Sequence, residues 1–542
     1  MLPNKSSTDD DKTLQLVVGS FIGLGILLRV VRFALNYPLW SDEAFVAANF
    51  LRRDYLDLLR PLDYGQICPV LFLWAVRACV GAFGFNEFSL RIFSLLCGIA
   101  SLGLFVKAAR NLLSGLPFLF ALALFAVSSP LVRYASEVKP YASDLLAALL
   151  LIVPALEWLK NREGPACLWR LAAFTPLALG LSSPAVFVAG GISFGLLIPV
   201  LRAQRRATLI PFLVFNLAIV LVFPSLYFLV LLPQSTVLPS LRADYWVDAF
   251  PPMGSPFALF RWVVAAHTGK MLGYPGGGSG GASTMTLVLM VAGSITLWKN
   301  RRRAALAALL GAFVTAFVAA ALRKYPYGFE TRTMQFIAPA VCLLAGAGLD
   351  AMMRLIPGSR IRRTVAAASL VGLFAGGLIS GGQFVSKPFI NPYDVKARAF
   401  ARTFWVEQAE GSEVACLMHD FGVYERTYLN LYSAIYLCNQ MIYAPSRRPD
   451  LNAGPRWDRI TTSHPLRCVL FRGTPVDHPR VKEWLAAMAP RFEVHGVETI
   501  RLDMSDRRGP RFIEPIVVFT LVPRSGMWAE HLTAAPIGAV RR

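Results

Sequence analysis

The sequence is short of charged residues. Asp, Glu, Lys and Arg make up 16% of its 542 residues, whereas a soluble domain carries about 25%. Apolar types make up 55%, in blocks of roughly 18–25 residues, the length that crosses a bilayer core of about 30 Å. This pattern excludes an ordinary soluble enzyme and predicts an all-α polytopic membrane protein.

Several familiar motifs are also missing. The chain has no H-E-x-x-H, G-x-S-x-G or Walker pattern, and its eight cysteines include no C-x-x-C pair and no set with zinc spacing. We therefore expect no cofactor, although carboxylates in the loops leave a divalent metal open. The cysteines are interpreted as free and buried, with one disulfide among the three in the C-terminal region as the alternative.

Acidic residues are scarcer than basic ones, 33 against 54, which gives a formal net charge of +21. Most basic residues stand in short clusters between apolar blocks, where they act as topology signals. We expect the lipid bilayer as the partner of this charge, and no nucleic acid.

About eleven transmembrane helices are expected, at residues 13–35, 88–110, 114–132, 141–159, 168–182, 184–201, 208–232, 282–298, 304–322, 336–354 and 363–384. Residues 1–12 then form a cytoplasmic tail, and residues 13–386 the transmembrane domain. A twelfth apolar stretch, 67–84, is interpreted as an interfacial helix of the first outer loop, because only then do the Lys/Arg-rich connections share the inner side.

Residues 387–542 have ordinary soluble patterning. Strands are expected at 413–418, 467–472 and 515–522, and a helix at 481–489. With an odd span count and the N-terminus inside, this small α/β domain is expected on the extracytoplasmic side. The whole is expected to be a multi-pass protein of the plasma (cytoplasmic) membrane.

Two adjacent acids, Asp42 and Glu43, follow the first span in "W-S-D-E-A-F". Ser41 or Asp42 is expected to cap a helix whose apolar residues at 45, 46, 50 and 51 lie on the membrane surface. The acids either complement the helix dipole or act chemically, because acids at a membrane edge are functional candidates. In the chemical alternative, one carboxylate of the pair accepts a proton from a substrate hydroxyl, and the other is a dipole partner or a supporting acid.

Charged residues also gather near the outer ends of other spans. Glu137 and Lys139, with Tyr141 beside them, either pair with each other or line a cavity with Asp42. Arg91 either pairs with Glu87 at i−4 or holds a phosphate. Two further arginines, Arg29 and Arg32 in the first span, are interpreted as snorkelling to the interface.

A late outer loop supplies the remaining candidates. Arg332 opens a span, and Tyr327 either stacks on a sugar or sits in the aromatic belt. The glycine-rich stretch 265–284 is not a P-loop and is interpreted as a flexible outer loop. His267 and Lys270 in this stretch are further candidates for phosphate binding.

Four short motifs follow one another along the chain: the acid pair, "N-E-F-S-L-R", "R-Y-A-S-E-V-K-P-Y" and "R-T-M-Q-F-I-A-P". Their order resembles that of the C-type (GT-C fold) glycosyltransferases that use polyprenyl-phosphate sugars. The nearest likenesses are to the protein O-mannosyltransferases and the lipid A aminoarabinose transferases, over most of residues 13–355. The resemblance implies that Asp42 is the base, that Glu137 is a second acid, and that Arg91 and Arg332 support the phosphate.

The expected function is therefore inverting transfer of a sugar from a polyprenyl-phosphate donor to an acceptor on a lipid, glycan or protein, at the extracytoplasmic face. The alternatives are a transporter or lipid flippase, which predicts acids or histidines within the spans, and a membrane anchor for a soluble binding domain.

Overall fold

The computed structural model describes residues 5–51, 53–161, 164–236, 246–278, 281–390, 394–396, 398–399, 413–414, 438–439, 442, 466–470, 479–503 and 513–524. The chain divides into two compact units, which are described in turn. Unit 1 comprises Met1–Tyr37, Arg53–Gly84 and Phe88–Pro388, and unit 2 comprises Pro38–Arg52, Phe85–Glu87 and Phe389–Arg542.

Within the described residues, nine helices are long and apolar enough to cross a membrane. They are α1 (Lys5–Ala34), α4 (Glu87–Leu112), α7 (Tyr141–Asn161), α9 (Ala185–Ala203), α10 (Arg206–Leu226, continued by η4, Tyr227–Leu231, and α11, Leu232–Thr236), α14 (Gly281–Lys299), α15 (Arg303–Ala321), α16 (Ala338–Arg354, preceded by η7, Thr331–Ile337) and α17 (Ser359–Ser386). The chain is a multi-pass membrane protein, as its apolar blocks predict.

Two of the expected spans fall on shorter helices, α5 (Gly115–Val127) and α8 (Ala166–Leu181). α5 is followed after Ser128 by α6 (Ser129–Tyr134), and the two together extend about 30 Å at 1.5 Å per residue. The stretch 67–84 contains α3 (Val70–Phe83) of 14 residues. At about 21 Å, α3 is shorter than the bilayer core, as an interfacial helix would be.

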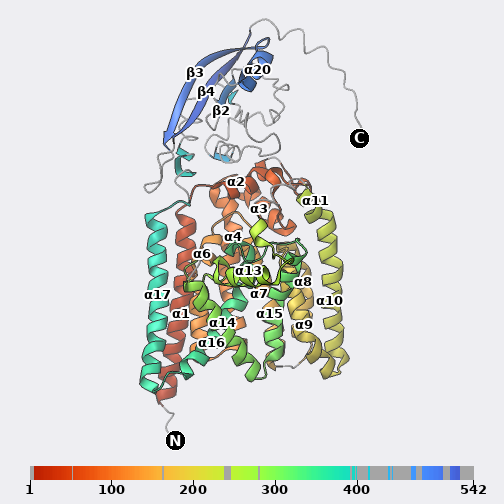
Figure 1. Cartoon of the computed structure of the whole chain (residues 1–542), viewed down its shortest axis with the longest axis vertical. Helices are drawn as coiled ribbons and strands as arrows, with labels where there is room; N and C mark the ends of the chain where they lie inside the picture. The colour runs from red at the N-terminus through yellow and green to blue at the C-terminus, as the bar shows by residue number, and fades with distance from the viewer. Residues whose placement is uncertain are drawn as a thin grey trace. The chain divides into compact units, whose positions relative to one another are not determined.

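Small residues allow close packing of the helices in unit 1. α9 packs against α15, α14 against α16, and α1 against α17 (Figure 1). α1 also packs against α5. Gly191 and Gly311 lie in contact where α9 meets α15, and Gly348 lies against the Leu289 carbonyl where α14 meets α16. Helix pairs in membranes associate through such small residues because their backbones can then approach closely.

Short elements fill the connections of unit 1: η2 (Asp57–Leu59), η3 (Asp63–Gly65), η5 (Val247–Ala249), α13 (Pro256–Thr268) and η6 (Lys270–Leu272). The prediction of a flexible loop at 265–284 is wrong for the part up to residue 278. Met271, Leu272 and Tyr274 are buried, and the Ser129 amide donates to the Pro275 carbonyl at 2.8 Å. Residues 279–280 lie outside the described part.

Unit 2 combines α2 (Ser41–Ala47) and η1 (Ala48–Leu51) with a four-stranded sheet in the order β1-β2-β4-β3 and the helix α20 (Pro479–Met488). β1 (Glu413–Val414) pairs in parallel with β2 (Leu466–Leu470), and β4 (Ile513–Pro523) is antiparallel to both β2 and β3 (Phe492–Asp503). The predicted α/β class, β2, α20 and β4 are confirmed. β3 is an addition, and residues 415–418 of the first predicted strand are not described.

The helix with the acid pair begins differently from the prediction. Its N-cap is Trp40, which makes no side-chain cap hydrogen bond, so capping by Ser41 or Asp42 is wrong. The predicted membrane-facing stripe is also wrong for Phe45, Val46 and Phe50, which are buried. Within unit 2, the Cys438 thiol contacts the Ala44 carbonyl at 3.7 Å.

The described cysteines agree with the predicted free thiols. Cys68, Cys97, Cys342 and Cys438 are buried and free, and Cys79 and Cys167 are free and half-buried.

Candidate functional site

Arg91 is a buried arginine near the start of α4. Its side chain is 2% exposed, and Nη1 donates to the Tyr37 carbonyl at 2.6 Å. The Arg91 guanidinium therefore holds the end of the segment that follows α1. Asp42 comes five residues later in the sequence, so the covalent chain keeps it within about 17 Å of Tyr37.

Arg32 is a site residue that the sequence reasoning missed. Its guanidinium lies over the rings of Tyr37, at 4.0 Å, and Phe384, at 4.7 Å, and it interacts electrostatically with Arg91, Arg133 and Glu137. The snorkelling interpretation is wrong for Arg32, which is 4% exposed.

Arg29 also departs from the snorkelling interpretation. It is fully buried and donates from Nη1 to the carbonyls of Gly25, at 2.8 Å, and Ala126, at 3.0 Å. These bonds join α1 to α5 inside unit 1, so Arg29 has a packing role rather than an interfacial one.

Glu137 forms an ion pair with Arg133, the second residue that the sequence reasoning missed. Arg133 Nε lies 2.8 Å from Glu137 Oε1, and the Glu137 side chain is 1% exposed. The neighbouring carboxylate raises the pKa of Arg133 further above its ordinary range. Their i,i+4 spacing was a signal for this pair, since such residues are neighbours along a helical turn.

Lys139 and Tyr141 lie next to this pair in the sequence and have partners of their own. Lys139 is buried and donates from Nζ to Gln66 Oε1 at 2.7 Å, which ties the first loop of unit 1 to the α6–α7 connection. The rings of Tyr141 and Tyr134 meet edge to face with centroids 5.0 Å apart.

Arg332 completes a group that we call the arginine cluster: Arg32, Arg91, Arg133 and Arg332. Arg332 lies over the Trp246 ring at 5.7 Å and interacts electrostatically with Arg133. The cluster thus lies near the ends of α1 and α6 and near the starts of α4 and η7. Guanidinium groups bind phosphate oxygens in bidentate fashion, so this end of unit 1 suits an anion.

His267, half-buried near the end of α13, and the buried Tyr327 form a second pair in unit 1. His267 Nδ1 is 2.8 Å from the Val263 carbonyl, and Nε2 is 3.1 Å from the Tyr327 hydroxyl. A carbonyl only accepts, so Nδ1 donates, and the neutral ring accepts the hydroxyl proton at Nε2. Burial lowers the pKa of His267 below its ordinary value of 6.5, which favours the neutral ring.

Lys270 pairs with Glu330 rather than with any of the other predicted residues. Lys270 Nζ lies 2.7 Å from Glu330 Oε1, and the Thr331 hydroxyl donates to the Lys270 carbonyl at 2.6 Å. These bonds fix the turn after α13 against the segment that leads into Arg332.

The predicted base belongs to unit 2. Asp42 and Glu43 stand in the first turn of α2, where Asp42 is half-buried and Glu43 is fully buried. Unit 2 also contains Glu87, whose Oε1 lies 3.8 Å from Arg398 Nη1. The predicted site residues are thus divided between the units, with two acids in unit 2 and the phosphate-binding candidates in unit 1.

Among the described residues, no three His, Cys, Asp or Glu side chains are grouped in a way that could hold a metal ion. The described site offers guanidinium, ammonium and carboxylate groups, together with the phenol of Tyr327 and the imidazole of His267.

Comparison with known proteins gives a fold but no sequence relative. No family model and no curated protein matches the chain. Among solved structures, ArnT from Cupriavidus metallidurans in the apo state aligns with a TM-score of 0.51 at 13% identity, over 94% of this chain and 98% of that chain.

The same ArnT bound to undecaprenyl phosphate aligns with a TM-score of 0.50 at 13% identity, over 92% of this chain and 97% of that chain. The chain has the GT-C fold. The archaeal oligosaccharyltransferase AglB from Archaeoglobus fulgidus, in complex with an inhibitory peptide and a dolichol-phosphate, aligns with a TM-score of 0.47 at 12% identity, over 92% of this chain and 74% of that chain. The fold comparison rests on the two ArnT structures.

Proposed function

We propose that this GT-C protein is a membrane glycosyltransferase that moves a sugar from a polyprenyl-phosphate carrier to an acceptor at the extracytoplasmic face. The arginine cluster carries this proposal, because four guanidinium groups at the ends of membrane-spanning helices match the phosphate of a lipid whose chain lies in the bilayer. The likeness to ArnT, which was solved with undecaprenyl phosphate, adds support from the fold.

In the proposed step, an acceptor oxygen or nitrogen attacks the anomeric carbon of the donor sugar. The new bond forms as the bond between that carbon and the phosphate oxygen breaks, and the electron pair leaves with the phosphate. Negative charge therefore grows on the polyprenyl phosphate, where Arg91, Arg133 and Arg332 stabilise it. A single displacement of this kind inverts the anomeric centre.

Asp42 is the proposed base, which takes the proton of the acceptor hydroxyl or amine. A carboxylate is a weak base for a hydroxyl, so proton transfer follows the development of positive charge at the sugar, as in glycoside hydrolysis. Glu43 is fully buried and less suited to meet an acceptor, and Glu137 is paired with Arg133. Among these three acids, half-buried Asp42 is the best candidate.

The alternative of transport finds less support in the arrangement of the charges. A transporter uses ionisable groups along a path near the middle of the membrane. The arginine cluster lies instead at helix ends, with Arg91 in the second turn of the 26-residue α4 and Arg133 on the short α6. A fold alone does not decide between the two functions, so the test must measure chemistry.

The direct test is turnover of purified protein with synthetic polyprenyl-phosphate sugars and a panel of lipid and peptide acceptors. Asp42→Asn should reduce transfer by at least about 10²-fold, the lower range for loss of a general base, while donor binding persists. Asp57→Asn is the matched control, because Asp57 belongs to the same loop and pairs with the exposed Arg60 at 3.3 Å.

Equal turnover of Asp42→Asn and the wild type would remove Asp42 as the base. Failure of the wild type to release any sugar from any polyprenyl-phosphate donor, together with donor-independent lipid movement in vesicles, would replace the glycosyltransferase proposal with the transport alternative.

A further inference from the structure

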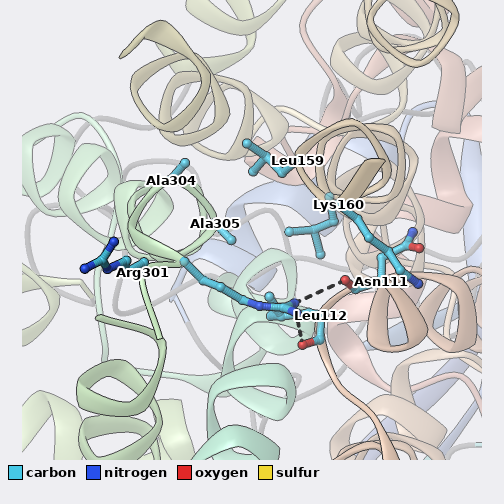
Figure 2. A pocket seen from close by; sticks show the side chains of 9 residues that line it. Asn111, Leu112, Leu159, Lys160, Arg301, Ala304 and Ala305 are labelled. Atoms are coloured by element: carbon cyan, nitrogen blue, oxygen red, sulfur yellow. Dashed lines mark hydrogen bonds between the residues drawn. The ribbon is translucent and has the colours of Figure 1, made fainter. Parts of the chain in front are cut away.

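A pocket of about 190 Å³ lies between the ends of α4 and α7 and the start of α15. Nine residues line it, and Figure 2 shows Arg301 and Lys160 on opposite sides of the view. We call Lys160, Arg301 and Arg302, together with Asn111, the basic rim. We call Leu112, Leu156, Leu159, Ala304 and Ala305 the apolar floor.

The rim carries three positive charges, and none of the nine lining residues is acidic. Arg302 donates from Nη1 to the Leu112 carbonyl at 2.9 Å, and weakly to that of Asn111 at 3.5 Å (dashed lines in Figure 2). Lys160 donates from Nζ to the Arg110 carbonyl at 3.1 Å. These carbonyls position the two cations but carry no full charge, so the rim keeps its attraction for an anion.

The pocket is remote from the arginine cluster. α7 has 21 residues, and at 1.5 Å per residue it extends about 30 Å. Lys139 precedes the first turn of α7, and Lys160 lies in its last turn. The pocket therefore opens at the opposite end of unit 1, where the Lys/Arg-rich connections predict the cytoplasmic face.

We propose that this pocket binds the phosphate of an anionic phospholipid headgroup in the cytoplasmic leaflet. The rim matches the phosphate charge, and the apolar floor matches the glycerol backbone and the beginning of the acyl chains. A free phosphate ion would use only the rim. The position at the ends of spanning helices places the rim at the depth of lipid phosphates, where each basic residue contributes about 1 kcal/mol to the attraction of anionic lipid.

Capping offers a competing role for the same cations, since positive side chains at a helix C-terminus interact favourably with the last carbonyls. Lys160→Ala/Arg301→Ala tests lipid binding without removing the Arg302 bonds to the end of α4. The matched control is Lys299→Ala/Arg303→Ala, which removes two charges at the same end from residues outside the pocket. Arg303 instead lies over the Trp298 ring at 4.4 Å.

The experiment uses delipidated full-length protein in detergent and measures binding of phosphatidylglycerol by native mass spectrometry, with phosphatidylcholine and inorganic phosphate as separate probes. We expect phosphatidylglycerol to bind in preference to phosphatidylcholine, and the Lys160→Ala/Arg301→Ala variant to bind it about 25-fold more weakly, at about five-fold for each charge. The Lys299→Ala/Arg303→Ala variant should bind it like the wild type.

Three results would overturn the proposal. One is equal weakening in both double variants, which would show a general effect of charge. Another is unchanged binding in the pocket variant, with its fold confirmed by circular dichroism. The third is binding of inorganic phosphate that displaces phosphatidylglycerol at millimolar concentration, which would assign the pocket to a free anion.

Discussion

Arg133 and Glu137 form an ion pair at the end of the helix bundle, with Nε and Oε1 2.8 Å apart and Glu137 1% exposed. The pair fixes the connection between α6 and α7, and it sets one carboxylate among the guanidinium groups of the arginine cluster. It therefore affects both the stability of the chain and the charge that a phosphate would meet.

Glu137→Gln should destabilise the protein, because Arg133 loses its ion pair with this carboxylate. The expected loss is about 1–3 kcal/mol, the range for hydrogen bonds to charged groups. Arg133 itself stays one-third exposed to solvent. If Glu137 only positions Arg133, donor affinity should stay within about three-fold of the wild type. Thermal unfolding in detergent and donor titration measure the two effects. A double-mutant cycle with Arg133→Gln isolates the pair, and additive losses would show that the two residues do not couple.

Arg91→Ala should lower turnover by about 10²- to 10³-fold, the loss typical for one group that stabilises developing negative charge. Arg91→Lys should recover part of it, because the charge remains while the bidentate geometry is lost. Steady-state transfer rates with a fixed donor provide the measurement. Arg354→Ala serves as the control, since Arg354 is exposed and pairs only with Asp350 on its own helix among the described residues.

Acidification should destabilise the wild type partly through His267. Burial lowers the pKa of this residue below 6.5, so the unfolded chain takes up its proton first as the pH falls. The stability due to neutral His267 is complete above pH 6.5 and is lost as the pH falls toward the folded-state pKa.

The difference in thermal midpoint between pH 7.5 and 5.5 should therefore be smaller in His267→Gln than in the wild type. Tyr327→Phe is the companion variant. It removes the hydroxyl that contacts Nε2 and should cost about 0.5–1.5 kcal/mol at pH 7.5, while the pH-dependent part remains. An identical pH response in His267→Gln and the wild type would contradict this account.

Gly348→Ala should destabilise unit 1 by about 1–3 kcal/mol, because a Cβ at this position would meet the Leu289 carbonyl of the neighbouring helix and overpacking of this kind is costly. Gly372→Ala on α17 is the matched control, since nothing lies within 4 Å of its Cβ position. The control should be neutral or slightly stabilising, because alanine has the higher helix propensity. Equal midpoints for the two variants would argue against a close α14–α16 crossing.

The membrane-spanning part could be predicted from the sequence because bilayer thickness fixes the length of an apolar block. Local spacing did not identify the ion pairs. Lys139 was a candidate partner of Glu137 in the sequence, but Glu137 pairs with Arg133, four residues before it. Arg32 was missed because a basic residue near the end of a span is ordinarily a snorkelling residue, and only the fold brings it over Tyr37.

Contacts between distant segments explain the remaining differences. Cys438 and Ala44 are separated by 394 positions, and no periodicity in the chain indicates that they meet. The β3 strand was missed because its alternation of apolar and polar residues is interrupted. The interruption lies at Gly496, which has a φ of 60°, where the pairing with β4 shifts register between His495 and Glu498. The N-cap of α2 differs because Trp40 adopts the extended backbone that Ser41 or Asp42 was expected to have.

Unit 2 unites residues 38–52 with the C-terminal part of the chain. Removal of the C-terminal part would therefore also remove contacts of the helix that contains Asp42. A protein ended at residue 388 would keep all the described helices that are long and apolar enough to cross a membrane. It would lose Cys438, which contacts the helix of Asp42, and Arg398, which pairs with Glu87. Inactivity of such a fragment would therefore not identify the C-terminal region as an acceptor-binding module. That region is part of the scaffold around the proposed base, and it should be studied by point substitution within the intact chain.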